Sequence, residues 1–390
     1  MAVNKLDITM MEDVGTSASQ LLQRDGSGNL PAVNASQVTG LSEFTTSTSN
    51  PVITTNPSGG VGSLWYNKTA GTMYVCTDAT AGANVWTNVG AGSGNVQPWA
   101  FGGTNYGYTY GDASKATVNQ WSLSSDGNAT NIGNMSVARN TWGGQSSTIH
   151  GYCSGGKPPA AGSDLIEKFA FASGVGTWTD VGNLIEARHY VTSASGPTYG
   201  YLSAGAHTGV PSGHTDTIDK FPFASDSNAT DVGNLLQRKS GWGGANSETH
   251  AYDCGGYPGS HPYLNVIQKY PFATDTNSTD VGDLLAIAAG GSGASSESYG
   301  YFAGTENPLT DVIQKWSFTT DGNSTDVGNL AGGNFQSCGV SSLTYGYQAG
   351  GAGPSMGNVI QKYSFSADGN STDVGDLTAA FTYTGNGSQY

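Results

Sequence analysis

The chain has 390 residues, of which 59 are glycine; charged residues make up only 11% and aromatic residues 10%. Disordered chains lack aromatic residues, so this composition indicates a folded protein with many turns, as in β-rich architectures. The net charge of −15 and the absence of any Lys/Arg run exclude nucleic-acid binding, because phosphate backbones would be repelled. Met1–Asp7 has no basic region followed by an apolar core, and no apolar stretch approaches the roughly 18 residues of a membrane span. We therefore expect neither a secretory signal nor a membrane partner.

Residues 1–97 do not repeat. Residues 1–50 are rich in Thr, Ser, Gln and Asn, which favours an extended segment. Residues 51–97 contain three short β-patterned runs around a glycine turn, at 62–67, 72–76 and 84–90. Such a small β-hairpin module has too few apolar side chains to be stable by itself. We therefore expect it to attach to a neighbouring subunit or a larger assembly.

Two short motifs in this part carry a resemblance. Gly28-Asn-Leu-Pro-Ala32 is followed by Gly62-Ser-Leu-Trp-Tyr-Asn67 and Met73-Tyr-Val75. Both stretches resemble N-terminal segments of tailed-bacteriophage virion proteins, especially fibre and appendage proteins. The resemblance implies that residues 1–97 bind other virion proteins and that the rest of the chain is displayed. It also implies a homo-oligomer or a multi-copy part of the virion, assembled in the host cytoplasm.

From residue 98 onward one pattern recurs six times: an Ile-x-Lys-aromatic run, a polar turn, and Thr-Asp-Val-Gly-Asn/Asp-Leu. The glycine that ends each copy stands at Gly133, Gly182, Gly233, Gly282, Gly328 and Gly375, so the spacing is 46–51 residues. Short β-patterned runs between Gly-rich turns at this spacing are typical of propeller blades. The sequence predicts an all-β fold, with residues 98–390 forming a six-bladed β-propeller.

Each repeat contains four predicted strands. A Gly-rich innermost run is followed by a Tyr/His-Gly-Tyr strand that ends in glycine, as in Tyr299–Gly304, and then by the two strands named above. The order resembles kelch-type propellers, with a Gly-Gly pair after the second strand and an aromatic residue in the third. Trp178 matches the kelch tryptophan before the fourth strand in one repeat. Loop length varies almost only between the second and third strands. Binding residues are commonly found in such loops; the alternative is neutral drift at a tolerant surface.

The turn between the third and fourth strands reads Asp-x-Asn in most repeats, as in Asp226–Asn228 and Asp275–Asn277. It is similar to the opening of an EF-hand loop and also forms glycosylation sequons. No carboxylate closes the loop, and Asp and Asn commonly bond their own backbone in turns, so we predict hairpin turns without a metal. The four cysteines form no close pair. We predict no cofactor and no metal.

Basic and aromatic residues suggest a speculative ligand site. Arg139, Arg188 and Lys239 each fall six residues after the repeat glycine, and Trp142 and Trp242 are equivalent to each other. This half-ring would suit an anionic or carbohydrate ligand; the alternative is packing between blades with buried stems. The variable loops and the residue after Arg188 add further candidates, for which solvated loop side chains are the alternative: His189, His207, His214, Tyr257 and His261.

Three functions are compatible with these patterns. The leading interpretation is a non-enzymatic bacteriophage structural protein, a tail or capsid appendage or fibre that displays a propeller. The second is a receptor- or glycan-binding, lectin-like adhesin that contacts the host surface. The third, a propeller enzyme of the galactose-oxidase or sialidase kind, is disfavoured because a sialidase needs three arginines with Tyr and Glu, and only Arg139 and Arg188 are placed equivalently.

Three structural expectations follow from comparing the repeats. A ring is best sealed when one blade contains both termini, so residues 381–387 should pair in the blade of Tyr106–Trp121, where 99–103 is a competing innermost strand. Lysine in the third strand should pair with the Asp before Val-Gly, as in Lys220 and Asp231, because both are neutral in the first repeat. The varied loops, including 206–215 and 257–263, should share one face opposite the Asp-x-Asn turns.

Overall fold

The computed structural model describes residues 44–89, 102–112, 114–158, 162–173, 178–207, 213–241, 243–385 and 387–389. Its contacts divide the chain into two units, Met1–Pro98 and Trp99–Tyr390. Most of the predicted extended segment 1–50, and the candidate residue Trp242, lie outside the described residues. No helix in the described ranges is long and apolar enough to cross a membrane.

The first unit contains a four-stranded sheet in which β1 pairs in parallel with β2 and the other pairs are antiparallel. Its strands are β1 (Phe44–Ser47), β2 (Leu64–Asn67), β3 (Thr72–Asp78) and β4 (Val85–Asn88). Tyr74, Cys76 and Trp86 form its small core, and Trp65 meets Trp86 edge-on at a ring distance of 5.9 Å. The three predicted runs correspond to β2, β3 and β4, whereas β1 was not predicted.

The described residues of the second unit form six four-stranded sheets. In five of them the strands follow chain order, from the innermost strand outward. These are β8 (Gly143–Ser146), β9 (His150–Ser154), β10 (Ser163–Ala170) and β11 (Thr179–Arg188); β12 (Thr192–Ser195), β13 (Tyr199–Ser203), β14 (Thr215–Pro222) and β15 (Thr230–Lys239); β16 (Gly244–Asn246), β17 (His250–Gly256), β18 (Leu264–Pro271) and β19 (Thr279–Asp283); β20 (Ser292–Ser295), β21 (Tyr299–Glu306), β22 (Leu309–Ser317) and β23 (Thr325–Asn329); and β24 (Cys338–Ser341), β25 (Tyr345–Ala349), β26 (Val359–Ser364) and β27 (Thr372–Asp376).

The remaining sheet joins the two ends of this unit. Its order is β28-β5-β6-β7, with bounds β5 (Tyr106–Thr109), β6 (Thr117–Ser122), β7 (Thr130–Asn134) and β28 (Ser388–Gln389). Ser388 pairs with Tyr108, so the C-terminal strand lies in the predicted sheet. The predicted bounds 381–387 are wrong, because Phe381 is instead buried in a core cluster and its N–H donates to Gly357. Residues 99–101 lie outside the described ranges.

The sheets pack on one another through a repeated aromatic contact. The tyrosine that ends each Tyr/His-x-Tyr run is buried, and in five of the six sheets its ring meets aromatic rings of the third-strand run of the next sheet. Tyr152, for example, lies 5.4 Å from Phe221 and 5.0 Å from Phe223, measured between ring centroids. Alternate side chains of a strand point to opposite faces, and burial on both faces is what sheets stacked face to face require.

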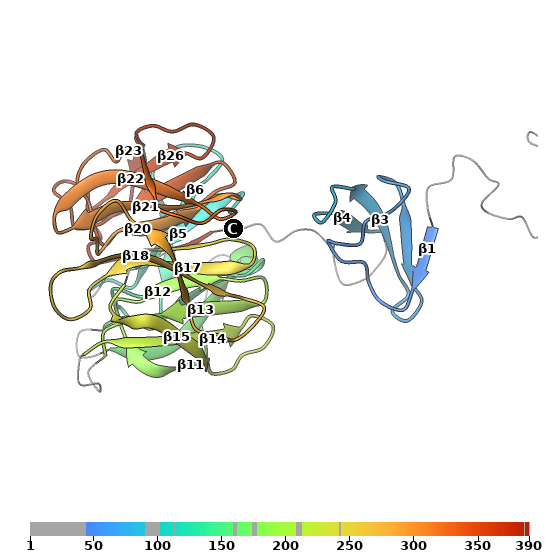
Figure 1. The fold of residues 1–390 in the computed structure, drawn as a ribbon, viewed down its shortest axis with the longest axis horizontal. Coiled ribbons are helices and arrows are strands. Elements are labelled where there is room, and N and C mark those ends of the chain that lie inside the picture. The colour runs from blue at the N-terminus through green and yellow to red at the C-terminus, as the bar shows by residue number, and fades with distance from the viewer. Residues whose placement is uncertain are drawn as a thin grey trace, which may run out of the picture. The chain divides into compact units, whose positions relative to one another are not determined.

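Neighbouring sheets succeed one another in a propeller-like arrangement. The innermost strands contact one another in the order β8, β12, β16, β20, β24, β28 and again β8. The sheet of β24–β27 also bonds to that of β5–β7, since Gly127 donates to the Val374 carbonyl and Ala129 to that of Asp376. Figure 1 shows the cyan strands from the start of this unit among the orange and red strands from its end. The fold class is therefore all-β and propeller-like.

Candidate functional site

The repeated lysines bind the next sheet rather than their own. In five cases the ammonium lies 2.5–2.6 Å from the Asp of the following Asp-x-Asn turn: Lys168–Asp226, Lys220–Asp275, Lys269–Asp321, Lys315–Asp368 and Lys362–Asp126. The prediction of a partner within the same repeat is therefore wrong. The Asp before Val-Gly instead accepts the N–H of the glycine two residues later, as Asp231 does from Gly233.

The Asp-x-Asn turns also bind backbone across the sheet boundary. The asparagine oxygen accepts the N–H that follows the repeat glycine of the preceding sheet, at 3.0 Å in five places; Asn277, for example, accepts from Asn234. Both polar side chains of the motif thus have protein partners. Among the described residues, no group of three or more His, Cys, Asp or Glu side chains is placed to hold a metal ion.

The predicted half-ring of cations is buried. Arg139, Arg188 and Lys239 are 0% exposed. Arg139 lies 2.8 Å from Glu167, Arg188 lies 3.0 Å from Asp219, and Lys239 binds Asp253. The guanidinium of Arg188 also donates to three backbone carbonyls, those of Leu202, Ala204 and Thr217. These cations are therefore inaccessible to a surface ligand, and packing between sheets accounts for them.

In this interior layer a buried cation occurs together with a carboxylate, and a neutral residue occurs together with a neutral partner. Where the cation is replaced by Asn334, its amide donates to Gln348, and the third-strand residue is the neutral Gln361. The residue at the third-strand position also makes a recurring hydrogen bond: its side-chain oxygen accepts a backbone N–H from the preceding sheet. Asp219 accepts from Ile185, and Gln268 accepts from Leu236. Burial raises the pKa of the Asp219 carboxyl, an effect that Arg188 opposes.

Trp142 is also part of the interior. It is 0% exposed and lies 5.8 Å from Tyr110, measured between ring centroids. Trp178 meets Tyr110 edge-on at 5.1 Å. Both tryptophans therefore pack where the first and second of the six sheets meet, and they offer no exposed face to a sugar.

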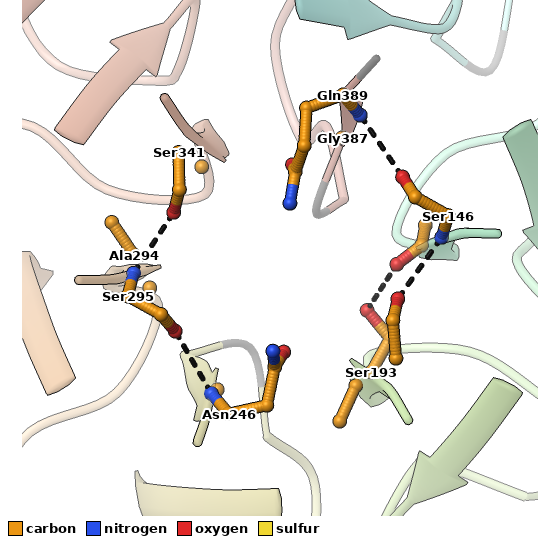
Figure 2. Close-up of a pocket in the computed structure, with 14 residues that line it drawn as sticks. Ser146, Ser193, Asn246, Ala294, Ser295, Ser341, Gly387 and Gln389 are labelled. Atoms are coloured by element: carbon orange, nitrogen blue, oxygen red, sulfur yellow. Dashed lines mark hydrogen bonds between the residues drawn. The ribbon is translucent and has the colours of Figure 1, made fainter. Parts of the chain in front are cut away.

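A narrow polar channel runs along the innermost strands. Figure 2 shows the labelled side chains from six strands arranged around an open centre. Serine hydroxyls join neighbouring strands here: Ser146 donates its N–H to Ser195 Oγ, Ser295 donates to Ser341 Oγ, and Gln389 donates to Ser146 Oγ. The cavity measures about 40 Å³. That volume suits a few water molecules and is far below the roughly 300–1,000 Å³ of a small-molecule site.

A second ring of residues stands shortly before the innermost strands in the chain. It consists of the residues eight positions after each repeat glycine, called the axial ring: Thr141, Tyr190, Gly241, Gly290, Gln336 and Tyr383. Backbone N–H groups donate from one member to the previous one, for example Tyr190 to Thr141 and Thr141 to Tyr383. The four members other than glycine have φ of 50–58°. Such left-handed conformations are costly for ordinary residues and often occur at functional sites.

The axial ring lies on the loop face, defined as the end of the sheets where two sets of loops meet. Isolated bridges join loops that follow the fourth strands to loops that follow the second strands: Asn140 to Lys157, His189 to Ala206, and Ser240 to Tyr257. The Asp-x-Asn turns lie at the opposite ends of the strands. The loops predicted to share a face are therefore neighbours.

Several predicted candidates come together on the loop face. Tyr257 lies 5.5 Å from His214, 5.8 Å from His261 and 5.4 Å from Tyr263 between ring centroids. The Tyr263 hydroxyl donates to Glu306 Oε1 at 3.0 Å. The other oxygen of Glu306 accepts from the Gln336 amide at 3.2 Å. We call Tyr257, His261, Tyr263, Glu306 and Gln336 the Tyr257 cluster.

The remaining candidate histidines lie beside this cluster. His189 meets Tyr190 at 4.7 Å, and His207 lies 3.8 Å from Glu186. Burial, with additional contributions from the charges of Lys157 and His214, lowers the pKa of His189 to about 4. Burial likewise raises the pKa of Tyr190, with Tyr383 and Glu306 adding to the effect.

Sequence reasoning had not included Tyr190, Glu306, Gln336 or Tyr383. Three of these are equivalent positions of the axial ring, where the residue type changes from repeat to repeat. The positions next to them change from repeat to repeat as well, so no local feature of the sequence distinguished these three residues. Glu306 stands at the tip of the β21–β22 hairpin, and no feature of the sequence distinguishes it there.

Comparison with known proteins supports only the fold. No family model matches the chain, and no curated protein matches it. A solved structure titled "Structure of YjhT" aligns with a TM-score of 0.55 and 10% identity, covering 71% of this chain and 99% of that one. At this identity the likeness is one of fold alone, which is all-β and propeller-like.

Proposed function

We propose that this chain is a non-enzymatic structural protein of a tailed-bacteriophage particle, a tail or capsid appendage or fibre. In this proposal residues 1–97 attach to other virion proteins. Residues 98–390 form a closed, six-bladed, kelch-like β-propeller that is displayed for contact with another protein or the host surface. Each particle contains several copies of the chain, either as single chains or as a homo-oligomer.

The buried charges carry the non-enzymatic part of this proposal. Arg139, Arg188 and Lys239, the equivalent cations of the repeats, are each neutralised inside the fold by a carboxylate. A catalytic group must instead reach a substrate in a pocket. The axial channel is too small for that role, since its cavity is about 40 Å³. The polar repeat residues therefore serve the fold, which leaves the varied loop face for recognition.

The small first unit supports the attachment role. Its core holds three buried side chains, while Phe44, Val52, Val61 and Val89 are 54–63% exposed. Exposed apolar groups on so small a sheet favour a protein partner. This agrees with the motifs of residues 28–32 and 62–67, which resemble phage attachment segments.

Purified particles test the proposal. Particles from a host that carries the gene are separated on a density gradient, and peptides of this chain are quantified by mass spectrometry. We expect the chain at a fixed ratio to the other particle proteins. Val61→Asp should reduce its incorporation, whereas the matched change Val137→Asp, at a 44% exposed position of the second unit, should not. Recovery of the full chain only in the soluble fraction would overturn the proposal.

A second candidate, a lectin-like adhesin, is favoured by the Tyr257 cluster. It combines aromatic rings with fixed hydrogen-bonding groups on the loop face, which is the combination that carbohydrate recognition uses. The two candidates are compatible, because a displayed propeller is where a particle would carry such a site.

A further inference from the structure

We propose that the Tyr257 cluster is a binding site for a neutral glycan. This inference deepens the display role proposed above and rests on it only for the setting in which the glycan is met. The site would lie on the loop face, between the loop after β17 and the hairpin of β21 and β22.

The aromatic part of the site is a small platform. Tyr257 meets Tyr263 at an interplanar angle of 90° and His214 at 85°. Edge-to-face contacts of this kind hold rings in place while leaving some ring faces uncovered. Tyr257 and Tyr263 are half-buried and His261 is exposed. A pyranose ring has apolar C–H faces that can pack on such a platform.

The polar part of the site is already oriented. Glu306 holds the Tyr263 hydroxyl with one oxygen and the Gln336 amide with the other. Gln336 is only 4% exposed, and its Oε1 has no hydrogen-bond partner among the described residues. A buried acceptor without a partner costs about 1–3 kcal/mol. A hydroxyl group that donates to Gln336 Oε1 would remove that cost, and a sugar supplies hydroxyls along its edge.

Nearby, His189 offers a second unsatisfied group. Its Nδ1 has no partner within the described ranges, and the residue is 9% exposed. The ring contacts Tyr190 of the axial ring, and it lies within the electrostatic influence of His214, which in turn contacts Tyr257. Two unsatisfied polar groups therefore flank the aromatic platform, as a ligand with several hydroxyls requires.

The charge of the site favours a neutral sugar over an acidic one. Glu306 belongs to the cluster; burial raises the pKa of Tyr263, and the hydrogen bond and charge of Glu306 add to this effect. The chain as a whole carries a net charge of −15. The three equivalent cations that could have bound a carboxylate or sulfate are buried in ion pairs. An anionic ligand would thus lie beside the Glu306 carboxylate, and the five residues of the Tyr257 cluster include no Lys or Arg to bind it.

A glycan array with the purified full-length chain tests the inference. The probes are neutral oligosaccharides of hexoses and N-acetylhexosamines, each beside a sulfated or uronate-containing counterpart. We expect neutral probes to bind and their acidic counterparts to bind less. The strongest neutral probe is then titrated by calorimetry against the variants. Tyr257→Ala should weaken binding about tenfold, which corresponds to loss of roughly 1.4 kcal/mol; Tyr263→Phe and Glu306→Gln, which keep side-chain shape, should weaken it about threefold.

Tyr106→Ala is the matched control, since Tyr106 is 41% exposed at the opposite end of the sheets; its binding should be unchanged. Thermal unfolding confirms that each variant is folded. The inference is overturned if no neutral probe binds, if acidic probes bind as well as neutral ones, or if Tyr257→Ala and Glu306→Gln both bind like the parent. Incorporation of Tyr257→Ala into particles is measured in parallel. The proposed function predicts normal incorporation, so the two proposals fail separately.

Discussion

Ionised side chains in the interior of this protein occur as matched sets. Arg188 and Asp219 come from different repeats, and both are essentially inaccessible to water. Removing water from two charges is costly, and a lone charge left behind costs more than the intact pair. This explains why cation and carboxylate are present together in three of the sheets and are replaced together by neutral residues such as Asn334 and Gln361.

Arg188→Met should therefore lower the free energy of unfolding by about 3–5 kcal/mol. The double variant Arg188→Met/Asp219→Asn should lose clearly less than the sum of the two single changes, because no unpaired charge remains. Denaturant titration of the variants measures this coupling. Arg238→Met serves as control, since its side chain is 50% exposed and 3.7 Å from Asp216, and it should cost less than about 1 kcal/mol. Equal losses for Arg188→Met and Arg238→Met would contradict the account.

His189 should make stability depend on pH. Burial lowers its pKa to about 4 in the folded protein, whereas an unfolded chain has a value near 6.5. A lowered pKa means that the contribution is fully present above about pH 6.5 and is lost as the pH falls towards 4. The NMR titration of His189 should have its midpoint well below 6. In parallel, the stability of His189→Gln should fall less steeply than that of the parent between these pH values. A His189 midpoint near 6.5 would disprove the prediction.

At the scale of elements, the repeated motif encodes contact between sheets. The lysine of one sheet forms an ion pair with the Asp-x-Asn turn of the next sheet. The repeat glycine leaves space for that turn. A Cβ on Gly233 would lie 2.6 Å from the Thr276 carbonyl oxygen, in the turn of the following sheet. The recurrence of this glycine thus follows from close approach between neighbouring sheets.

Gly233→Ala should consequently destabilise the protein more than Gly127→Ala. The two glycines have nearly the same φ, 152° and 153°, but a Cβ on Gly127 would meet nothing within 4 Å. Backbone strain is therefore common to both variants, and the difference isolates the clash. We expect that difference to be about 1–3 kcal/mol in chemical unfolding. Indistinguishable stabilities would show that the turn moves away at no cost.

For the whole second unit, the C-terminal strand completes the set of innermost strands. Ser388 pairs with Tyr108 of β5, and Gln389 donates to Ser146 of the next sheet. Two residues thus connect the first of the six sheets to the second along the channel. Without them, β5 would present an open edge.

A chain that ends at Gly387 should lose these contacts and unfold at a lower temperature, by about 5–10 °C if a few kcal/mol are lost. Differential scanning calorimetry measures the shift. Ser388→Ala is the control, since it keeps the strand and removes only the hydroxyl, which donates to the Gln145 carbonyl and also bonds the Tyr110 hydroxyl; its shift should be smaller. An unchanged midpoint for the truncated chain would mean that β28 does not contribute to closure.

The sequence by itself determined the repeat, the strands and the burial of both sheet faces. These properties are local, because the placement of Ile267 and Tyr270 on opposite faces of one strand requires no knowledge of neighbours. It also predicted which sheet receives the C-terminus, since a ring is best sealed when one blade contains both termini, although residues 99–103 were a competing innermost strand.

Only the tertiary structure decided which of the repeated positions contact each other. In a repeat protein a contact within one repeat and a contact with the next produce the same periodic pattern, so Lys220 could face Asp231 or Asp275. The only sequence feature that indicates a contact with the next repeat lies in the first repeat. There Gln120 replaces the lysine, and the following repeat has no Asp-x-Asn turn. The same reason applies to the site. Tyr263 and Glu306 are 43 residues apart, and their contact depends on the packing of two sheets, which no local pattern specifies.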